Sequence, residues 1–241
     1  MSPEENWYNE LLTRFGQITI ATMLLPVVVA LIRYKQLNRA SRIFLWYLVV
    51  IIAINLIEQA FIWAVNTYTA FWLPYLKQWQ IGDTNFLGVF PCLANFLFLG
   101  WFYSLIIVPA AVGKWVLRIS ILFALLSFVD YIWFTGYNVP GVFTPALNGI
   151  YTTFLPMIQL WFLIRQDHKV PLYKISYFWF SMGMILSHLF SLFFFVVTEK
   201  IYLTDFLLFV KLSIAGNCLR ILAQAVYANG FLKAKVLRYL Q

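Results

Sequence analysis

Residues 203–231 read LTDFLLFVKLSIAGNCLRILAQAVYANGF, and this apolar run is long enough to cross a bilayer as one helix. A transmembrane helix needs about 20 mostly apolar residues. Two basic residues, Lys211 and Arg220, interrupt the run. Because a charge at the bilayer centre costs on the order of 2.5–3.5 kcal/mol, we expect both residues to have a polar partner or a functional role. The rest of the chain is predicted to form a helical bundle around this segment.

The composition extends this prediction to the whole chain of 241 residues, of which 63% are hydrophobic and only 11% are charged. Soluble domains carry about 25% charged residues. We therefore predict an all-α integral membrane protein, a single domain formed by a seven-transmembrane helix bundle. The connection after residue 65 is rich in aromatic residues and is expected to include a short interfacial helix broken at Pro74. The seven predicted helices span residues 11–32, 43–65, 86–108, 115–134, 146–164, 175–197 and 203–231.

The distribution of basic residues predicts the orientation of the bundle. Of 17 Lys and Arg residues, 12 lie in or beside the first, third and fifth connections and the C-terminal tail. Only three lie on the other side, and two lie within residues 203–231. By the positive-inside rule, the N-terminus is outside and the C-terminus is cytoplasmic. We expect a multi-pass protein of a bacterial inner (cytoplasmic) membrane.

The formal net charge of +8 is explained mostly by the basic residues that set this orientation. Basic residues at the cytoplasmic ends of the helices also contact anionic lipid headgroups. The lipid bilayer is therefore the expected partner, and no nucleic-acid partner is expected.

Polar residues within the predicted helices define a candidate site. At a rise of about 1.5 Å per residue, two carboxylates, an imidazole and an ammonium lie at a similar depth near the outer surface. A carboxylate within hydrogen-bond distance would keep a buried lysine ionised. We predict a polar site for a small molecule or ion. One alternative is a structural ion pair of Lys211 with Glu58 or Asp130, and the other is that the side chain of Lys211 or Asp130 reaches the membrane interface. The predicted ligand or ion site consists of Glu58, Asn55, Asn95, Asp130, His188 and Lys211.

A second set of residues predicts contacts between helices or subunits. Asn217, Arg220 and Gln224 share one stripe of their helix, and Lys211 points to the opposite side. One of these faces is expected to meet another subunit unless the helix contains a bulge, although Arg220 could also reach cytoplasmic headgroups. Small residues at four-residue spacing suit close helix packing, either within the chain or in a homo-oligomer. These small residues are Gly183, Ser187 and Ser191.

The sequence carries no recognisable catalytic or metal motif. It has two histidines, one of them His168 in a predicted cytoplasmic connection, and neither HExxH nor GxSxG is present. Retinal on Lys211 would need a carboxylate counterion, and residues 86–108 contain no acidic residue where microbial rhodopsins carry theirs. We therefore predict no cofactor, no metal and no enzymatic activity, with a membrane enzyme of another type as the alternative.

Several stretches together carry a family resemblance. They are NFLFLGWFYSLI at 95–106, ILFALLSFVDYIWF at 121–134, FWFSMGMILSHLFSLFFF at 178–195 and KLSIAGNCLRILAQAVYANGF at 211–231. On these stretches the chain resembles small seven-helix inner-membrane proteins of unknown function from Bacteroidota-type bacteria. Such proteins are often encoded beside sensor histidine kinases, so the resemblance implies a sensory subunit that signals through a partner protein.

These observations lead to one functional hypothesis and two alternatives. The hypothesis is a receptor-like protein that binds a small molecule or ion from the outer side. Helices kinked at Pro26, Pro91 and Pro156 would transmit the change to the cytoplasmic connections. The first alternative is a small transporter or channel with an intramembrane proton or ion relay. The second is a structural subunit of a membrane complex.

Overall fold

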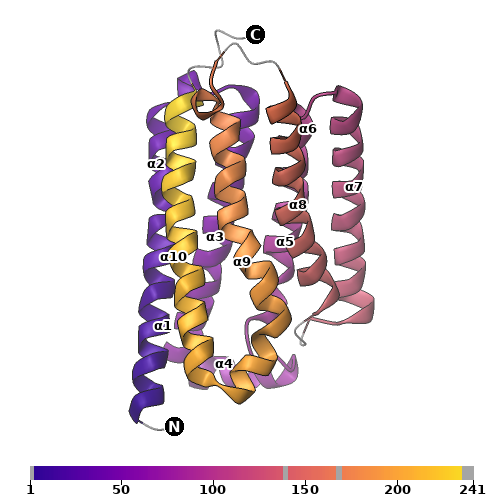
Figure 1. The fold of residues 1–241 in the computed structure, drawn as a ribbon. Coiled ribbons are helices and arrows are strands. Elements are labelled where there is room, and N and C mark those ends of the chain that lie inside the picture. Colours follow the sequence, from indigo (N-terminus) through magenta and orange to yellow (C-terminus); the bar gives the residue numbers. More distant parts are fainter. Residues whose placement is uncertain (1–2, 138–140, 167–169, 235–241) are drawn as a thin grey trace.

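The computed structural model describes residues 3–137, 141–166 and 170–234, and every regular element in these ranges is helical. Seven helical segments are long and apolar enough to cross a membrane. They stand side by side in one bundle (Figure 1). The prediction of an all-α chain with seven membrane-length helices is thus confirmed. His168, Lys169, Lys235 and Arg238 of the predicted cytoplasmic side lie outside the described residues.

The helices follow one another along the chain with short connections. Two of the membrane-length segments contain a π-helical turn, at η3 and at η4. In chain order the elements are α1 (Pro3–Thr22), α2 (Leu24–Ile32), η1 (Tyr34–Gln36), α3 (Arg39–Thr67), α4 (Thr69–Gln78), η2 (Asn85–Leu87), α5 (Val89–Ala94), η3 (Asn95–Leu99), α6 (Gly100–Ile106), α7 (Ala110–Val129), η4 (Asp130–Phe134), α8 (Phe143–Arg165), η5 (Leu172–Lys174), α9 (Ser176–Thr204) and α10 (Phe206–Lys233).

Capping side chains set the start of two long helices. The Oδ1 atom of Asn38 accepts a hydrogen bond of 2.9 Å from the backbone N–H of Ser41, and α3 therefore begins at Arg39, one turn before the predicted start. The Oδ1 atom of Asp205 accepts one of 2.9 Å from the N–H of Leu208, so α10 begins at Phe206. Each cap satisfies a backbone donor that the helix itself leaves free.

Prolines distort the helices to different degrees. Pro26 has no N–H to donate to the carbonyl four residues earlier, and the first segment is interrupted nearby at Met23. Pro156 lies within α8 without breaking it. The expected break at Pro74 is wrong, because α4 continues through this residue. The short α4 has no buried residue, so the carbonyl that Pro74 leaves free can be solvated.

The core of the bundle centres on the ring of Phe44, which is fully buried on α3. Its ring centroid lies 5.0 Å from that of Phe102 on α6, 4.5 Å from that of Phe180 on α9 and 5.2 Å from that of Tyr227 on α10. Aromatic side chains bury a large area each, so this cluster fixes four helices against one another.

The two ends of the bundle differ in charge. The chain starts at one end, where α4 and the connection from η4 to α8 also lie (Figure 1). The opposite end holds the termini of helices that carry basic residues: the start of α3, the start of α7, the end of α8 and the end of α10 (Figure 1). The 12 basic residues counted from the sequence therefore gather, as far as they are described, at a single end.

The small residues of α9 face α10 of the same chain. A Cβ atom placed on Gly183 would lie 2.5 Å from the ring of Tyr227, so the two helices touch at this point. The hydroxyl oxygens of Ser187 and Tyr227 are 3.1 Å apart, and Arg220 donates a hydrogen bond of 3.0 Å to the hydroxyl of Ser191. These contacts are all intramolecular.

Asn217 and Gln224, the other two residues of the predicted stripe, also lie on α10, but they differ in burial. Gln224 is buried, and its Oε1 atom has no hydrogen-bond partner among the described residues. Asn217 is half-buried. No bulge interrupts α10 between Phe206 and Lys233, and Lys211 is exposed on its surface.

Replacing Gly183 with Ala is expected to destabilise the folded protein. The added methyl group would force α9 away from Tyr227, and overpacking of this kind costs about 1–3 kcal/mol. The midpoint of thermal unfolding in detergent, followed by circular dichroism, measures the change. The control is Gly16→Ala on α1, where an added Cβ meets nothing within 4 Å. An unchanged midpoint for Gly183→Ala would contradict the close contact.

Candidate functional site

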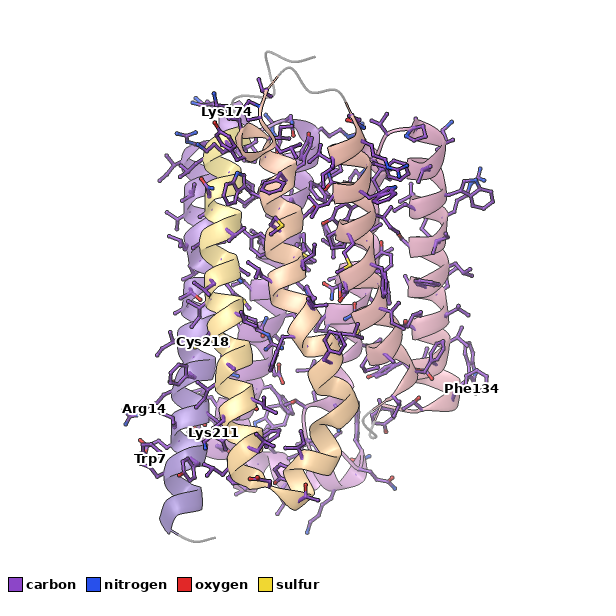
Figure 2. All side chains as sticks on the ribbon, in the orientation of Figure 1. Trp7, Arg14, Phe134, Lys174, Lys211 and Cys218 are labelled. Atoms are coloured by element: carbon purple, nitrogen blue, oxygen red, sulfur yellow. The ribbon has the colours of Figure 1, made fainter. Side chains whose placement is uncertain are left out.

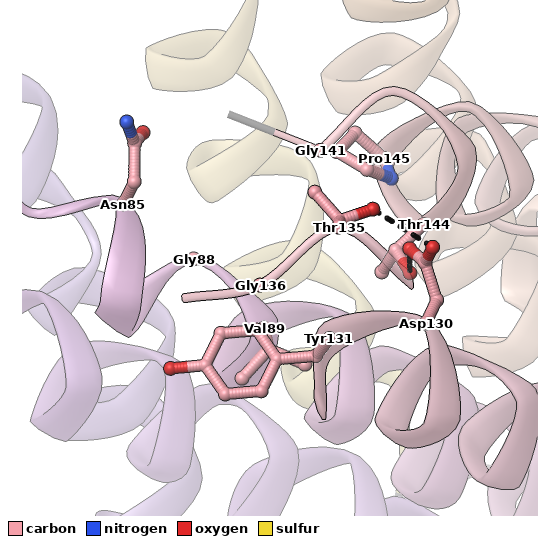
Figure 3. Close-up of a pocket in the computed structure, with 10 residues that line it drawn as sticks. All are labelled: Asn85, Gly88, Val89, Asp130, Tyr131, Thr135, Gly136, Gly141, Thr144 and Pro145. Atoms are coloured by element: carbon pink, nitrogen blue, oxygen red, sulfur yellow. Dashed lines mark hydrogen bonds between the residues drawn. The ribbon is translucent and has the colours of Figure 1, made fainter. Parts of the chain in front are cut away.

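The candidate site forms around Asp130, where α7 gives way to the π-helical turn η4. The carboxylate is buried, with 8% of the residue exposed. One oxygen accepts a hydrogen bond of 2.8 Å from the Thr135 hydroxyl, and the other accepts one of 2.7 Å from the Thr144 hydroxyl (Figure 3). Asp130 therefore links the end of α7 to the start of α8.

The π-helical geometry of η4 places these groups together. The N–H of Thr135 donates to the carbonyl of Asp130 over 2.8 Å, a bond that spans five residues instead of the four of an α-helix. Such turns occur mostly as single bulges and are frequent at functional sites. Here the wider turn brings the hydroxyl of Thr135 back to the carboxylate of Asp130.

A pocket of about 190 Å³ lies against this carboxylate. Its wall comes from the start of α5, from η4 and the residues after it, and from the start of α8 (Figure 3). Asp130 is the one charged side chain among the described lining residues. The ring of Tyr131 also lines the pocket, and its hydroxyl donates a hydrogen bond of 2.8 Å to the carbonyl of Phe86. The pocket thus combines a carboxylate, two hydroxyls and an aromatic ring.

Glu58 and Asn55 do not line this pocket. The carboxylate of Glu58 accepts a hydrogen bond of 2.7 Å from the hydroxyl of Thr84, which precedes the pocket-lining Asn85. Glu58 therefore holds the chain that forms one wall of the pocket. The amide of Asn55 donates over 2.8 Å to the carbonyl of Ile51, one turn earlier in its own helix.

Asn95 lies deeper in the bundle, at the start of η3. Its amide nitrogen donates a hydrogen bond of 3.0 Å to the side-chain oxygen of Asn148 on α8. The Asn95 side chain is buried, and its own oxygen has no partner among the residues that the structure describes. This pair joins η3 to α8 by a polar contact, one helical turn or so from Thr144 along α8.

Within the described ranges, neither Lys211 nor His188 forms a hydrogen bond or an ion pair with Glu58 or Asp130. Lys211 is exposed on α10 (Figure 2) and forms no ion pair with Glu58 or Asp130; within the described ranges the ion pair present is Arg14–Glu10, at 2.6 Å. His188 is half-buried on α9, close enough to Arg220 for an electrostatic interaction. The structure therefore does not bring the six predicted residues into one site.

Sequence reasoning selected Asp130 and missed the hydroxyls that surround it. Thr135 and Thr144 flank the Gly- and Pro-rich stretch that connects η4 to α8. A polar residue on each side of a tight connection, next to an acidic residue at the helix end, is the signal that could have identified them.

A second group of buried polar side chains lies in the middle of the bundle. The hydroxyl of Ser181 donates over 2.7 Å to the side-chain oxygen of Gln159 and lies 3.2 Å from the hydroxyl of Tyr103. Three helices, α6, α8 and α9, contribute to this group. Because these contacts satisfy one another and join three helices, they serve helix packing.

The fold and the pocket together define an all-helical protein with seven membrane-length helices and an acid-lined pocket at the end where its chain begins. No family model, no curated protein and no solved structure matches the chain.

Replacing Asn148 with Leu is expected to destabilise the bundle by about 1–3 kcal/mol, because the Asn95 amide would be left buried without a partner. Replacing both residues with Leu removes both polar groups and is expected to restore most of that loss. Thermal unfolding of the two single variants and the double variant gives the coupling energy. If the double variant loses the sum of the two single losses, the pair is not coupled.

Proposed function

We propose that this chain is a receptor-like multi-pass membrane protein that binds a small cationic molecule in the Asp130 pocket and signals through a partner protein. The observation that carries the proposal is the Asp130 carboxylate, which lies in a pocket without a basic residue among the described lining residues. A buried carboxylate is costly to hold in apolar surroundings unless it is paired. A bound cation would provide that pairing.

The rest of the pocket also suits a cation. The aromatic ring of Tyr131 offers the negative face that attracts organic ammonium groups. Thr135 and Thr144 hydroxyls can turn to accept hydrogen bonds from a ligand while the carboxylate binds its charge. A volume of about 190 Å³ favours a small molecule over a peptide.

Ligand binding at this position can alter the bundle because Asp130 holds two helices together. A cation on the carboxylate competes with the Thr144 hydroxyl that links α7 to α8. The contact has two arrangements, one with the Thr144 hydroxyl on the carboxylate and one with the ligand in its place. A ligand that prefers one of these two arrangements shifts the population between them.

The orientation proposed for the protein places the pocket outside. The basic residues gather at the opposite end of the bundle, and the positive-inside rule assigns that end to the cytoplasm of a bacterial inner membrane. Signals would then reach a partner at the basic end; the sequence resemblance to proteins encoded beside sensor histidine kinases supports a kinase in that role.

The receptor is favoured over the predicted relay because the three relay residues form no hydrogen bond or ion pair with one another within the described ranges. Among the described side chains, Glu58, His188 and Lys211 share no hydrogen bond, and each lies in different surroundings. A relay of protons or ions needs neighbouring polar groups across the membrane.

Replacing Asp130 with Asn is expected to abolish stabilisation by organic cations. The probe is a panel of small primary amines and quaternary ammonium compounds, with uncharged alcohols of the same size for comparison. A ligand at 100 times its Kd stabilises the native state by about 2.7 kcal/mol, which thermal unfolding in detergent detects readily.

The matched control is Glu58→Gln. This variant also removes a negative charge from the same end of the bundle, yet its amide oxygen can still accept the hydrogen bond from Thr84. It is expected to keep the stabilisation seen in the unaltered protein. If no cation stabilises the unaltered protein, or if Asp130→Asn responds as well as Glu58→Gln, the proposed ligand class is wrong.

The proposed orientation predicts the behaviour of fusions at the C-terminus. A green fluorescent protein fused there is expected to fluoresce, because it matures in the cytoplasm, and an alkaline phosphatase fused there is expected to be inactive. Fluorescence and phosphatase activity of whole cells measure the two outcomes. The reverse pattern would place the Asp130 pocket on the cytoplasmic side.

A further inference from the structure

A second cavity, of about 690 Å³, lies at the basic end of the bundle, far from the Asp130 pocket. It is an open groove between the start of α3 and the segment formed by η3 and α6. We call it the arginine groove. Its principal lining residues are Arg39, Arg42, Ile43, Trp46, Phe98 and Trp101.

The two arginines of the groove are held by aromatic rings and by no acidic residue. The guanidinium carbon of Arg42 lies 4.9 Å from the ring centroid of Tyr34, and that of Arg39 lies 5.9 Å from that of Trp101. Neither arginine has an ion pair within the described ranges, and the Nε–H of Arg42 is buried without a hydrogen-bond partner there. The groove therefore carries two positive charges without an acidic partner among the described residues.

The start of α3 adds to this positive character. The N-terminal end of a helix carries a partial positive charge from its free backbone N–H groups. Asn38 caps the N–H of Ser41, and Arg39, which lines the groove, is the first residue of the helix. Cationic side chains near a helix N-terminus are unfavourable unless an anion is present.

The rest of the groove is apolar and open. Trp46 and Trp101 are 52% and 42% exposed, although both are large aromatic side chains. Trp46 lies seven residues after Arg39, about 10 Å farther along α3 toward the middle of the bundle. Arginines at the end of a helix and tryptophans one to two turns inward match the headgroup level and the interfacial belt of a bilayer.

We propose that the arginine groove is a specific site for an acidic phospholipid. The lipid phosphate binds to Arg39 and Arg42, and one acyl chain lies along Ile43, Trp46 and Phe98. Arginine binds phosphate through charge-assisted, bidentate hydrogen bonds. A phosphate without an acyl chain would leave the apolar part of the groove uncovered, and a neutral lipid would leave the arginine charges unpaired.

Native mass spectrometry of the detergent-purified protein tests this site. The probes are phosphatidylglycerol, phosphatidylcholine with the same acyl chains, and glycerol phosphate. The unaltered protein is expected to retain phosphatidylglycerol in preference to the other two. Arg42→Gln and Arg39→Gln are each expected to weaken phosphatidylglycerol binding roughly tenfold or more, because each removes a charge-assisted hydrogen bond.

The matched control is Arg118→Gln. Arg118 lies at the same end of the bundle and also contacts a tryptophan ring, with its guanidinium carbon 5.1 Å from the Trp115 centroid, but it does not line the groove. Arg39 is exposed, so its replacement leaves the fold intact, as circular dichroism would verify. Equal losses in Arg118→Gln and Arg39→Gln, or equal retention of phosphatidylcholine and phosphatidylglycerol, would overturn the proposal. Retention of glycerol phosphate at the affinity of phosphatidylglycerol would also overturn it, because the acyl chain would then contribute nothing.

Discussion

Polar side chains inside this bundle depend on hydrogen bonds to neighbouring segments, because the apolar interior provides few other partners. Asn95 bonds to Asn148, Ser181 bonds to Gln159, and Asp130 accepts from two threonines. Apart from the local Asp130–Thr135 bond, each of these contacts joins two different helices. Apolar packing around Phe44 brings the helices together, and the hydrogen bonds specify which faces meet.

The helices could be predicted from sequence because hydrophobic runs of membrane length leave few alternatives. The differences lie at their ends and in their local geometry. The cap at Asn38 starts α3 at Arg39. This start lies within a stretch that was predicted to be a connection because it contains several arginines. The π-helical turns at Asn95 and Asp130 are invisible to hydropathy, because they change the path of the backbone without changing its composition.

The candidate site could be predicted only in part, and the reason is geometric. Depth along a helix follows from residue number, which is why Asp130, Glu58 and Lys211 were expected at one level. The direction in which a side chain points depends also on the rotation of its helix, which no count of residues provides. Lys211 faces outward on α10, and Glu58 binds to Thr84 beside the pocket. Of the six predicted residues, Asp130 alone is among the described residues that line the pocket.

The close approach of α9 to α10 at Gly183 holds these two helices tightly together. α8 packs extensively on α9, α9 packs extensively on α10, and α1 and α2 lie against α10 (Figure 1). By contrast, α7 packs on the α5–α6 segment and touches α8 at few places. The Asn95–Asn148 and Asp130–Thr144 bonds both cross the seam between these two halves. A small displacement at this seam would therefore act first on the contact between α7 and α8, which involves few residues besides the Asp130–Thr144 pair.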